Sequence, residues 1–301
     1  MTARRPHTSG RRDAFTLVEL LVVIGIIGIL IAILLPVLNK INQQAKAARC
    51  AANLADMGRA WRMYADANQG VCVPGRLPRI EPTRSYGMGP FNAYRPRWYE
   101  LLGAQVKKLA NPNPTTDQDD TWMVNDPWFL CPAVPEYRNS RNYPYGYNHQ
   151  FLGNARPRAD GKMTNFPVKA AGIRGDTVMA MDSLGTAAGK PWRERTSYRF
   201  DGSKDEWAVL NKGYLIDPPR LTDSSDYADV KHRSPIDRSG PDARHMGMVN
   251  VVFCDGHVER RTIQSLGYLV RLDGSIAVEG PGVHNRLFSG DGTDKDPPPV
   301  K

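Results

Sequence analysis

The chain is poor in cysteine and lacks the usual cysteine motifs. Its 301 residues include only four cysteines, and no two of them form a Cys-x-x-Cys pair. Neither a zinc ribbon nor a thioredoxin-type redox site is therefore indicated. If the body of the chain is exported, one disulfide is possible, and we favour Cys72 with Cys131. The alternative is four buried thiols that act as small hydrophobic groups. The cysteines are Cys50, Cys72, Cys131 and Cys254.

Signatures of catalysis and of nucleic-acid binding are also missing. The sequence contains no G-x-S-x-G, no P-loop and no H-E-x-x-H, so we predict no enzyme, no catalytic residues and no cofactor. The net charge is +9, but it is spread over Pro- and Gly-rich segments without a run of five or six Lys or Arg. We therefore expect no nucleic-acid partner.

One long apolar run stands near the N-terminus. Phe15 to Leu38 is 24 residues long, and its only charge is Glu19. As a helix it would measure about 36 Å, enough to span a hydrocarbon core of about 30 Å. Four arginines between positions 4 and 12 precede it, which predicts a cytoplasmic N-terminus. The chain is thus expected to contact membrane lipid through a single span.

Glu19 distinguishes between three interpretations of this run. A secretory signal peptide would be shorter and would be followed promptly by an A-x-A site. A plain anchor would leave a carboxylate in lipid, at a cost of about 2–3 kcal/mol. Cleavage between Ala14 and Phe15 would instead create an α-amino group four residues before Glu19, which is one helical turn away. The ammonium and the carboxylate would then neutralise each other, within a chain or between neighbours.

A short basic leader, a small residue and then Phe-Thr-Leu-Val-Glu before an apolar helix resembles the processing signal of type IV prepilins and type II secretion pseudopilins. The resemblance implies cleavage after Ala14, N-methylation of Phe15 and use of Glu19 to set the assembly register. Pro36 matches the helix-kinking proline of such subunits. The family usually has Gly before the cut, and Ala14 stands there in this chain, so slower processing is expected.

The resemblance also implies partners and a location. The partners would be prepilin peptidase, other pseudopilin subunits, and an inner-membrane assembly platform with its ATPase. The protein would sit in the inner membrane with a periplasmic head, as a structural subunit of a fibre of a type II secretion or type IV pilus-like system.

Beyond the membrane, the sequence predicts an α+β fold. An apolar stripe at spacings of three and four continues the helix to about Asn68, where Asn68-Gln69-Gly70 supplies a stop. A short helix is expected at 98–109, a strand at 176–182, and a hairpin at 248–263 that turns at Asp255-Gly256. These elements predict a small antiparallel sheet packed on a long helix, with long loops. The expected segments are a leader (1–14), a transmembrane helix (15–38), its exported half (39–70), a globular head (71–285) and a disordered tail (286–301).

His245 precedes Asp255-Gly256 by nine residues, and His257 follows. The strand between His245 and Asp255 would be about 20 Å long, so the two cannot share one ion and we predict no metal there. We expect Asp255 and Gly256 to form the turn and His245 to hydrogen-bond a neighbouring loop. The spacing resembles the prepilin processing-associated domain named for its His, nine residues, Asp-Gly. Further matches to that family are Cys50-x-x-Asn53-Leu54, Cys131-Pro132 and Tyr145-Gly146-x-Asn148.

Two alternatives remain open. The chain could be a membrane-anchored exported ligand-binding protein or hydrolase that uses His245, Asp255 and His257. Asp291, Asp294 and Asp296 could hold calcium, although a solvated tail is the interpretation we favour.

Overall fold

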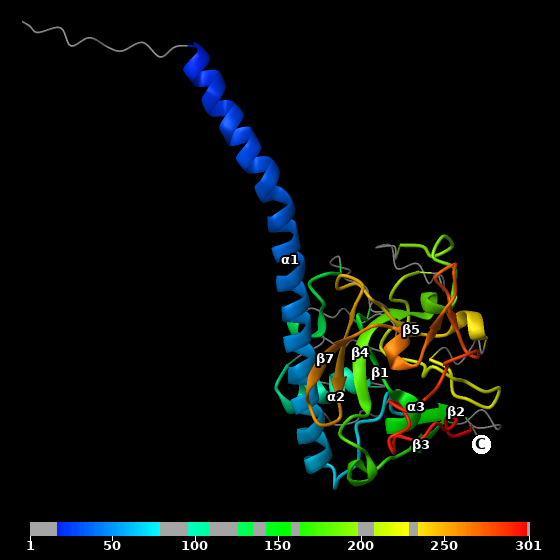
Figure 1. The fold of residues 1–301 in the computed structure, drawn as a ribbon. Helices are drawn as coiled ribbons and strands as arrows, with labels where there is room; N and C mark the ends of the chain where they lie inside the picture. The colour runs from blue at the N-terminus through cyan, green and yellow to red at the C-terminus, as the bar shows by residue number, and fades with distance from the viewer. Residues whose placement is uncertain are drawn as a thin grey trace, which may run out of the picture. The chain divides into compact units, whose positions relative to one another are not determined.

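The computed structural model divides into two compact units, Met1–Gln44 and Ala45–Lys301, and its elements are labelled in Figure 1. The helix α1 spans Leu17–Ala67 and continues through Pro36, and its residues up to Gln44 belong to the first unit. The structure describes residues 17–78, 96–108, 126–134, 143–157, 163–197, 208–228 and 234–299.

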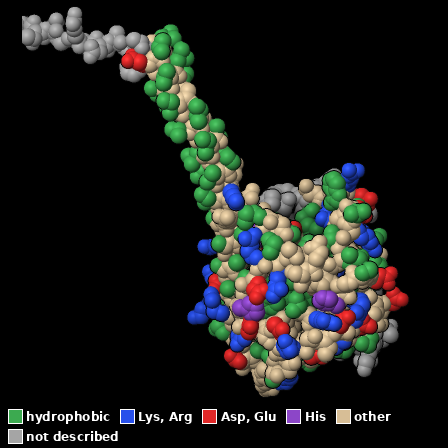
Figure 2. Space-filling model, viewed as in Figure 1, with side chains coloured by type: hydrophobic (Ala, Val, Ile, Leu, Met, Phe, Trp, Pro, Cys, Tyr) green, Lys and Arg blue, Asp and Glu red, His purple; other side chains and the backbone are tan. Residues whose placement is uncertain are grey.

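The first part of α1 is apolar on all sides. Its large hydrophobic side chains from Leu17 to Ile41 are all exposed, and hydrophobic side chains lie along the face of this helix that Figure 2 shows. A helix that is apolar all round is either buried in protein or in lipid. Among the described residues, α1 is the one helix long and apolar enough to cross a membrane. This part of the chain therefore suggests anchoring in a membrane.

The last part of α1 belongs to the second unit. A stripe of its residues is buried against the head: Ala47, Cys50, Leu54, Met57, Ala60 and Trp61. The helix ends at Ala67, one residue before the predicted end. Gly70 adopts a φ of +76°, and its N–H donates to the carbonyl of Ala65 at 2.8 Å. Glycine adopts this left-handed conformation without steric cost, so it closes the helix.

The main sheet is small and antiparallel. Its central strands are β4 and β6, with β1 beside β4 and β7 beside β6, while β5 pairs with the end of β4. The helix α1 runs alongside these strands in the second unit (Figure 1). The bounds are β1 Tyr145–Tyr147, β4 Val178–Gly185, β5 Gly240–Pro241, β6 Val249–Phe253 and β7 Val258–Arg261. The α+β prediction, with its strand near 176–182 and its hairpin at 248–263, is confirmed.

Smaller elements surround the sheet. The helices are α2 Trp98–Gln105 and α3 His149–Leu152, and the additional strand pairs are β2 Asn154–Pro157 with β3 Met163–Phe166 and β8 Leu269–Val270 with β9 Ile276–Ala277. Short 3-10 turns are η1 Pro127–Phe129, η2 Ala170–Gly172, η3 Thr186–Gly189, η4 Pro235–Asp237 and η5 Gln264–Leu266.

Alternate residues of β6 face two different cores. Val252 packs in the core that contains the buried stripe of α1. Val249, Val251 and Phe253 pack in a second core with Phe288. This alternation follows from the period of two in a strand, and it places Asn250, like Val252, on the α1 side.

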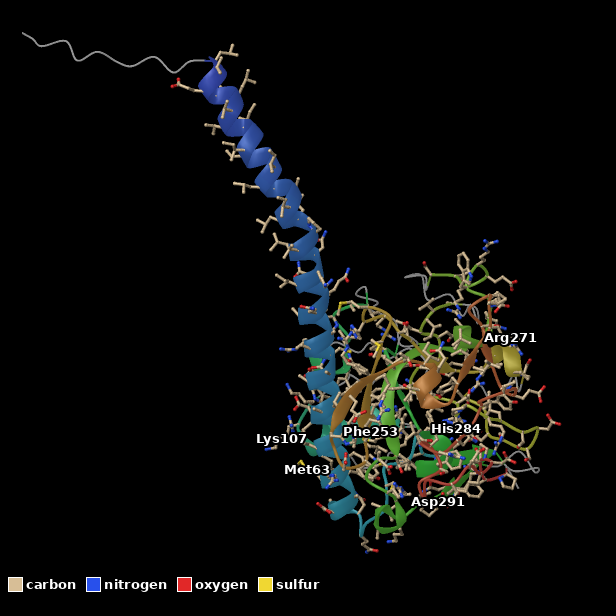
Figure 3. The ribbon with its side chains drawn as sticks, in the orientation of Figure 1. Met63, Lys107, Phe253, Arg271, His284 and Asp291 are labelled. Carbon is tan, nitrogen blue, oxygen red and sulfur yellow. The ribbon has the colours of Figure 1, made fainter. Side chains whose placement is uncertain are left out.

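The C-terminal stretch differs from the prediction of a disordered tail. Residues 286–299 are part of the second unit and lie against its other segments, and Figure 3 labels Asp291 in this stretch. Phe288 is fully buried, and the Arg220 guanidinium contacts the carboxylates of Asp294 and Asp296 at 2.9 and 2.7 Å. The polar composition of this stretch suggested a solvated segment, but its carboxylates form ion pairs within the fold.

The contacts of these carboxylates also argue against the alternative that Asp291, Asp294 and Asp296 bind calcium. Asp291 accepts from Lys295 at 2.6 Å, and Arg220 holds the other two carboxylates. Cations of the chain itself therefore engage all three side chains.

Candidate functional site

The residues predicted to act in processing and assembly lie at the start of the chain. Ala14 and Phe15 fall outside the described residues, so cleavage and methylation stay predictions. Glu19 lies in the first turn of α1, where a negative charge interacts favourably with the helix dipole. Pro36 lies inside the helix, and the kink stays a prediction.

A second candidate site is formed by residues from separate motifs in the head. Cys50 comes from α1, Cys131 from the loop after η1, and His245 from the turn before β6. Asp182 of the central strand β4 completes the group. All four side chains are buried, and their ligand atoms lie within 4.8 Å of one another. We call these four residues the buried cluster.

Direct contacts link the buried cluster. The Sγ of Cys50 lies 3.1 Å from Oδ1 of Asp182, and the Sγ of Cys131 lies 3.4 Å from Nε2 of His245. The same Nε2 lies 3.5 Å from Oδ2 of Asp182. The carboxylate of Asp182 thus lies between Cys50 of α1 and His245 of the turn before β6.

Neighbouring polar groups hold the cluster in place. The backbone N–H of Asn250 donates to Oδ2 of Asp182 at 2.7 Å. The hydroxyl of Tyr145 lies 3.2 Å from Sγ of Cys50. The side-chain amide of Asn53 donates to the carbonyls of Pro127 and Leu130, both at 3.0 Å. Because Leu130 adjoins Cys131, Asn53 ties that loop to α1.

The surroundings of the buried cluster favour the charged forms of Cys131 and His245. Hydrogen bonds from Cys50 and His245 outweigh burial and lower the pKa of Cys131 to about 5. Burial raises the pKa of Cys50 well above its ordinary value. For His245, burial opposes the charged form, but hydrogen bonds to Asp182 and Cys131 outweigh it and raise the pKa to about 9. Without a bound cation, the arrangement favours a thiolate at Cys131 beside an imidazolium.

Asp255 and Gly256 lie at the other end of β6. Gly256 adopts a φ of +90° in the turn, and the side chain of Asp255 accepts from the backbone N–H of His257 at 3.0 Å. Asp255 and His257 are exposed and are not members of the buried cluster. The structure therefore does not form the site of His245, Asp255 and His257 on which the hydrolase alternative depended.

The sequence interpretation placed His245 correctly against a loop but missed its companions. Cys50, Cys131 and His245 all stand in the motif stretches quoted above, which is a signal that could have grouped them. Asp182 carried no such signal. All four cysteines lie among the described residues as buried free thiols, so the predicted Cys72–Cys131 disulfide is wrong. The sulfur of Cys131 instead lies beside Cys50 and His245.

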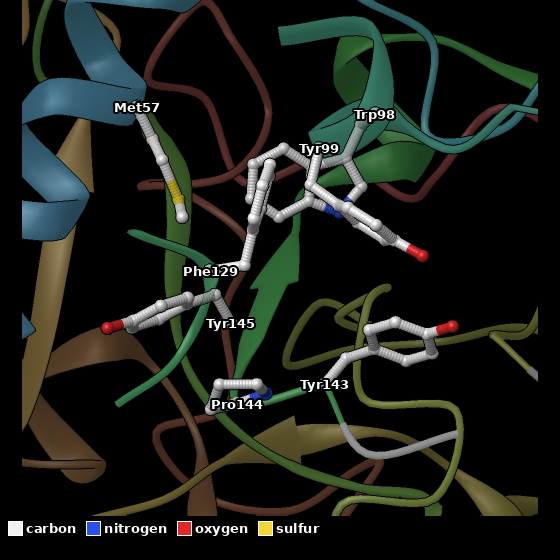
Figure 4. A pocket seen from close by; sticks show the side chains of 7 residues that line it. All are labelled: Met57, Trp98, Tyr99, Phe129, Tyr143, Pro144 and Tyr145. Atoms are coloured by element: carbon white, nitrogen blue, oxygen red, sulfur yellow. The ribbon is translucent and has the colours of Figure 1, made fainter. Parts of the chain in front are cut away.

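An aromatic pocket adjoins the cluster (Figure 4). Its cavity measures about 10 Å³, which is room for about one water molecule. It is too small for an organic ligand, so its rings serve as packing. The lining residues are Met57, Trp98, Tyr99, Phe129, Tyr143, Pro144 and Tyr145.

Comparison with known proteins gives a match only for the N-terminal segment. Residues 10–35 match the model of the prokaryotic N-terminal methylation motif. No curated protein and no solved structure matches the chain. The matched segment includes Ala14, Phe15 and Glu19 and most of the exposed apolar part of α1. This match supports identification of the chain as a prepilin-like protein with an N-terminal helix suited to a membrane.

Proposed function

We propose that the protein is a structural pseudopilin-like subunit. Prepilin peptidase would cleave it between Ala14 and Phe15, and the mature chain would assemble through its N-terminal helix into a periplasmic fibre of a type II secretion or type IV pilus-like system. The observation that carries the proposal is the methylation motif at residues 10–35, which coincides with a helix exposed and apolar on every side.

The physical basis of assembly lies in the first unit. Helices within a bilayer gain no hydrophobic energy over lipid, so close packing and polar contacts must select their register. In the proposed fibre, the carboxylate of Glu19 meets the methylated amine of Phe15 on a neighbouring subunit and sets the axial step. A buried ion pair of this kind is sensitive to the loss of either member.

The topology follows from the charge around the span. The arginines before Phe15 keep the N-terminus cytoplasmic, which places the head in the periplasm. An inner-membrane platform and its cytoplasmic ATPase would add or withdraw subunits.

The test combines mass spectrometry of the mature N-terminus with an assembly assay. We expect N-methyl-Phe15 at the N-terminus of the wild-type chain. Glu19→Ala is expected to leave cleavage intact and to abolish sedimentable fibres, whereas Glu279→Ala, at an exposed position of the head, should change neither. An intact Met1, a cut after Ala47, or normal fibres from Glu19→Ala would overturn the proposal.

A further inference from the structure

We propose that Cys50, Cys131, Asp182 and His245 bind one Zn²⁺ ion that locks the head onto α1. The proposal concerns the second unit alone and does not depend on cleavage or fibre formation. The two proposals can therefore fail separately.

The donor types select the metal. Two thiolates, one imidazole and one carboxylate supply four ligands, which is the number that structural zinc sites use. Calcium and magnesium require shells of oxygen ligands, and this cluster offers only the oxygens of Asp182. Soft sulfur ligands with imidazole favour zinc among the common divalent ions.

The spacing of the donor atoms fits a tetrahedron. With Zn–S bonds of about 2.3 Å and Zn–N or Zn–O bonds of about 2.0–2.1 Å, ligand atoms in a tetrahedral site lie about 3.3–3.8 Å apart. Three of the six distances between donor atoms in the buried cluster measure 3.1, 3.4 and 3.5 Å, and all six are within 4.8 Å. Movements of about 1 Å or less would therefore bring all four donors to the distances of a tetrahedral zinc site.

The charges of the ligands also suit a divalent cation. Binding the ion would displace the protons of Cys50 and His245, and Asp182 and the two thiolates would then carry three negative charges in a buried place. Zn²⁺ offsets two of these charges. The buried guanidinium of Arg244, which also pairs with Asp242 at 3.0 Å, acts favourably on Asp182 and Cys131.

Outer contacts orient the ligands as in known metal sites, where hydrogen bonds to the ligands fix their geometry. The N–H of Asn250 holds Asp182. The guanidinium of Arg260 donates to the backbone carbonyl of His245 at 2.7 Å. Asn53 holds the loop that carries Cys131.

The site would be structural. Its four protein ligands fill a tetrahedral shell and leave no open position for water or substrate, and the four residues are between 0 and 2% exposed. The ion would connect segments far apart in sequence, because Cys50 and Asp182 are 132 positions apart and Cys131 and His245 are 114 apart. Cross-links that close such long loops restrict the unfolded chain most.

The experiment uses the full chain, purified in detergent under a thiol reductant. Elemental analysis is expected to find about one zinc ion per chain. Adding Zn²⁺ to the chelator-treated protein at about 100 times the Kd should raise the Tm by about 5–10 °C. Replacement by Co²⁺ should produce the visible bands of a tetrahedral site and a thiolate-to-cobalt charge-transfer band.

Variants assign the ligands. The double variant Cys50→Ser/Cys131→Ser is expected to lose the zinc and the charge-transfer band. Cys72→Ser and Cys254→Ser, which remove buried thiols outside the cluster, should keep both. The wild-type measurements stand even if the double variant fails to fold.

Three results would overturn the proposal. One is a reduced wild-type chain that neither contains zinc nor takes it up. Another is a cobalt form without a charge-transfer band. The third is loss of the metal in the Cys72→Ser or Cys254→Ser variant to the same extent as in the double variant.

Discussion

The sulfur of Cys50 on α1 lies 3.1 Å from Oδ1 of Asp182 on β4, across 132 positions of sequence. This contact joins the buried stripe of α1 directly to the central strand of the sheet. At the far end of β6, the turn at Gly256 approaches the same helix at Gly58. Near the start of β6, the side-chain amide of Asn250 donates to the carbonyl of Ala47 at 3.3 Å. The strand β6 therefore contacts α1 near both of its ends, and substitutions along this boundary should be costly.

Asn53→Ala should destabilise the head by about 1–3 kcal/mol, because two carbonyls would lose their buried donor. Those carbonyls belong to Pro127 and Leu130. The free energy of unfolding, measured by urea denaturation, checks this. Asn42→Ala, at an exposed position of the same helix, is the control. An equal effect of the two substitutions would show that the Asn53 contacts contribute no stability.

Gly58→Val should lower the free energy of unfolding by about 1–3 kcal/mol through overpacking. A Cβ at this position would lie 2.8 Å from Cγ2 of Val252 and 3.3 Å from Cα of Gly256. Valine has a slightly higher helix propensity than glycine, so a lower free energy of unfolding would come from the steric clash and not from helix propensity. Gly172→Val is the control, since a Cβ there meets no atom within 4 Å. Unchanged stability of Gly58→Val would mean that α1 does not approach the sheet this closely.

Asn285→Ala should release the C-terminal stretch. The buried side chain of Asn285 accepts from the N–H of Arg220 at 2.8 Å and donates to the carbonyls of Arg220 and Lys295, both at 3.1 Å. Without these bonds, residues 286–299 should be cleaved earlier by a protease of broad specificity, as followed by intact mass. Arg286→Ala, at an exposed neighbour, should keep the wild-type rate. Rapid removal of this stretch from the wild-type chain would restore the disordered-tail interpretation.

Ala14→Gly should speed conversion of precursor to mature chain, because the prepilin-like signal usually has Gly before the cut. Ala14→Leu should leave the precursor uncut, since a large side chain replaces the small one. Pulse-labelling in cells that contain the peptidase measures the two rates. Ala3→Leu, within the leader but away from the cut, should behave as wild type. Normal processing of Ala14→Leu would place the cleavage elsewhere.

Several features could be predicted from local patterns. The apolar run and the three-and-four stripe indicated α1, which ends at Ala67 within one residue of the prediction. Asp255-Gly256 indicated the turn between β6 and β7, because glycine permits the positive φ that a tight turn requires. Each of these features depends on residues that are neighbours in the sequence, so spacing and composition suffice.

The C-terminal stretch and the disulfide could not be predicted in this way. A tail rich in Asp and Pro has the composition of a solvated segment, and only the fold places Arg220 and Asn285 where they bind it. Similarly, the thiol partner of Cys131 depends on which buried segment crosses its loop. The spacing of the cysteines in the sequence does not indicate which of them lies beside Cys131.

The amino-acid sequence by itself determined the membrane-suited helix, the prepilin-like processing motif and the hairpin, because each arises from short-range periodicity or turn chemistry. Only the tertiary structure decided that Cys50, Cys131, Asp182 and His245 meet. Their side chains come from a helix, a loop, a strand and a turn, and packing of α1 on the sheet brings them within 4.8 Å. Long-range packing selects such partners through the burial of many apolar side chains at once, and this information is spread over the whole chain.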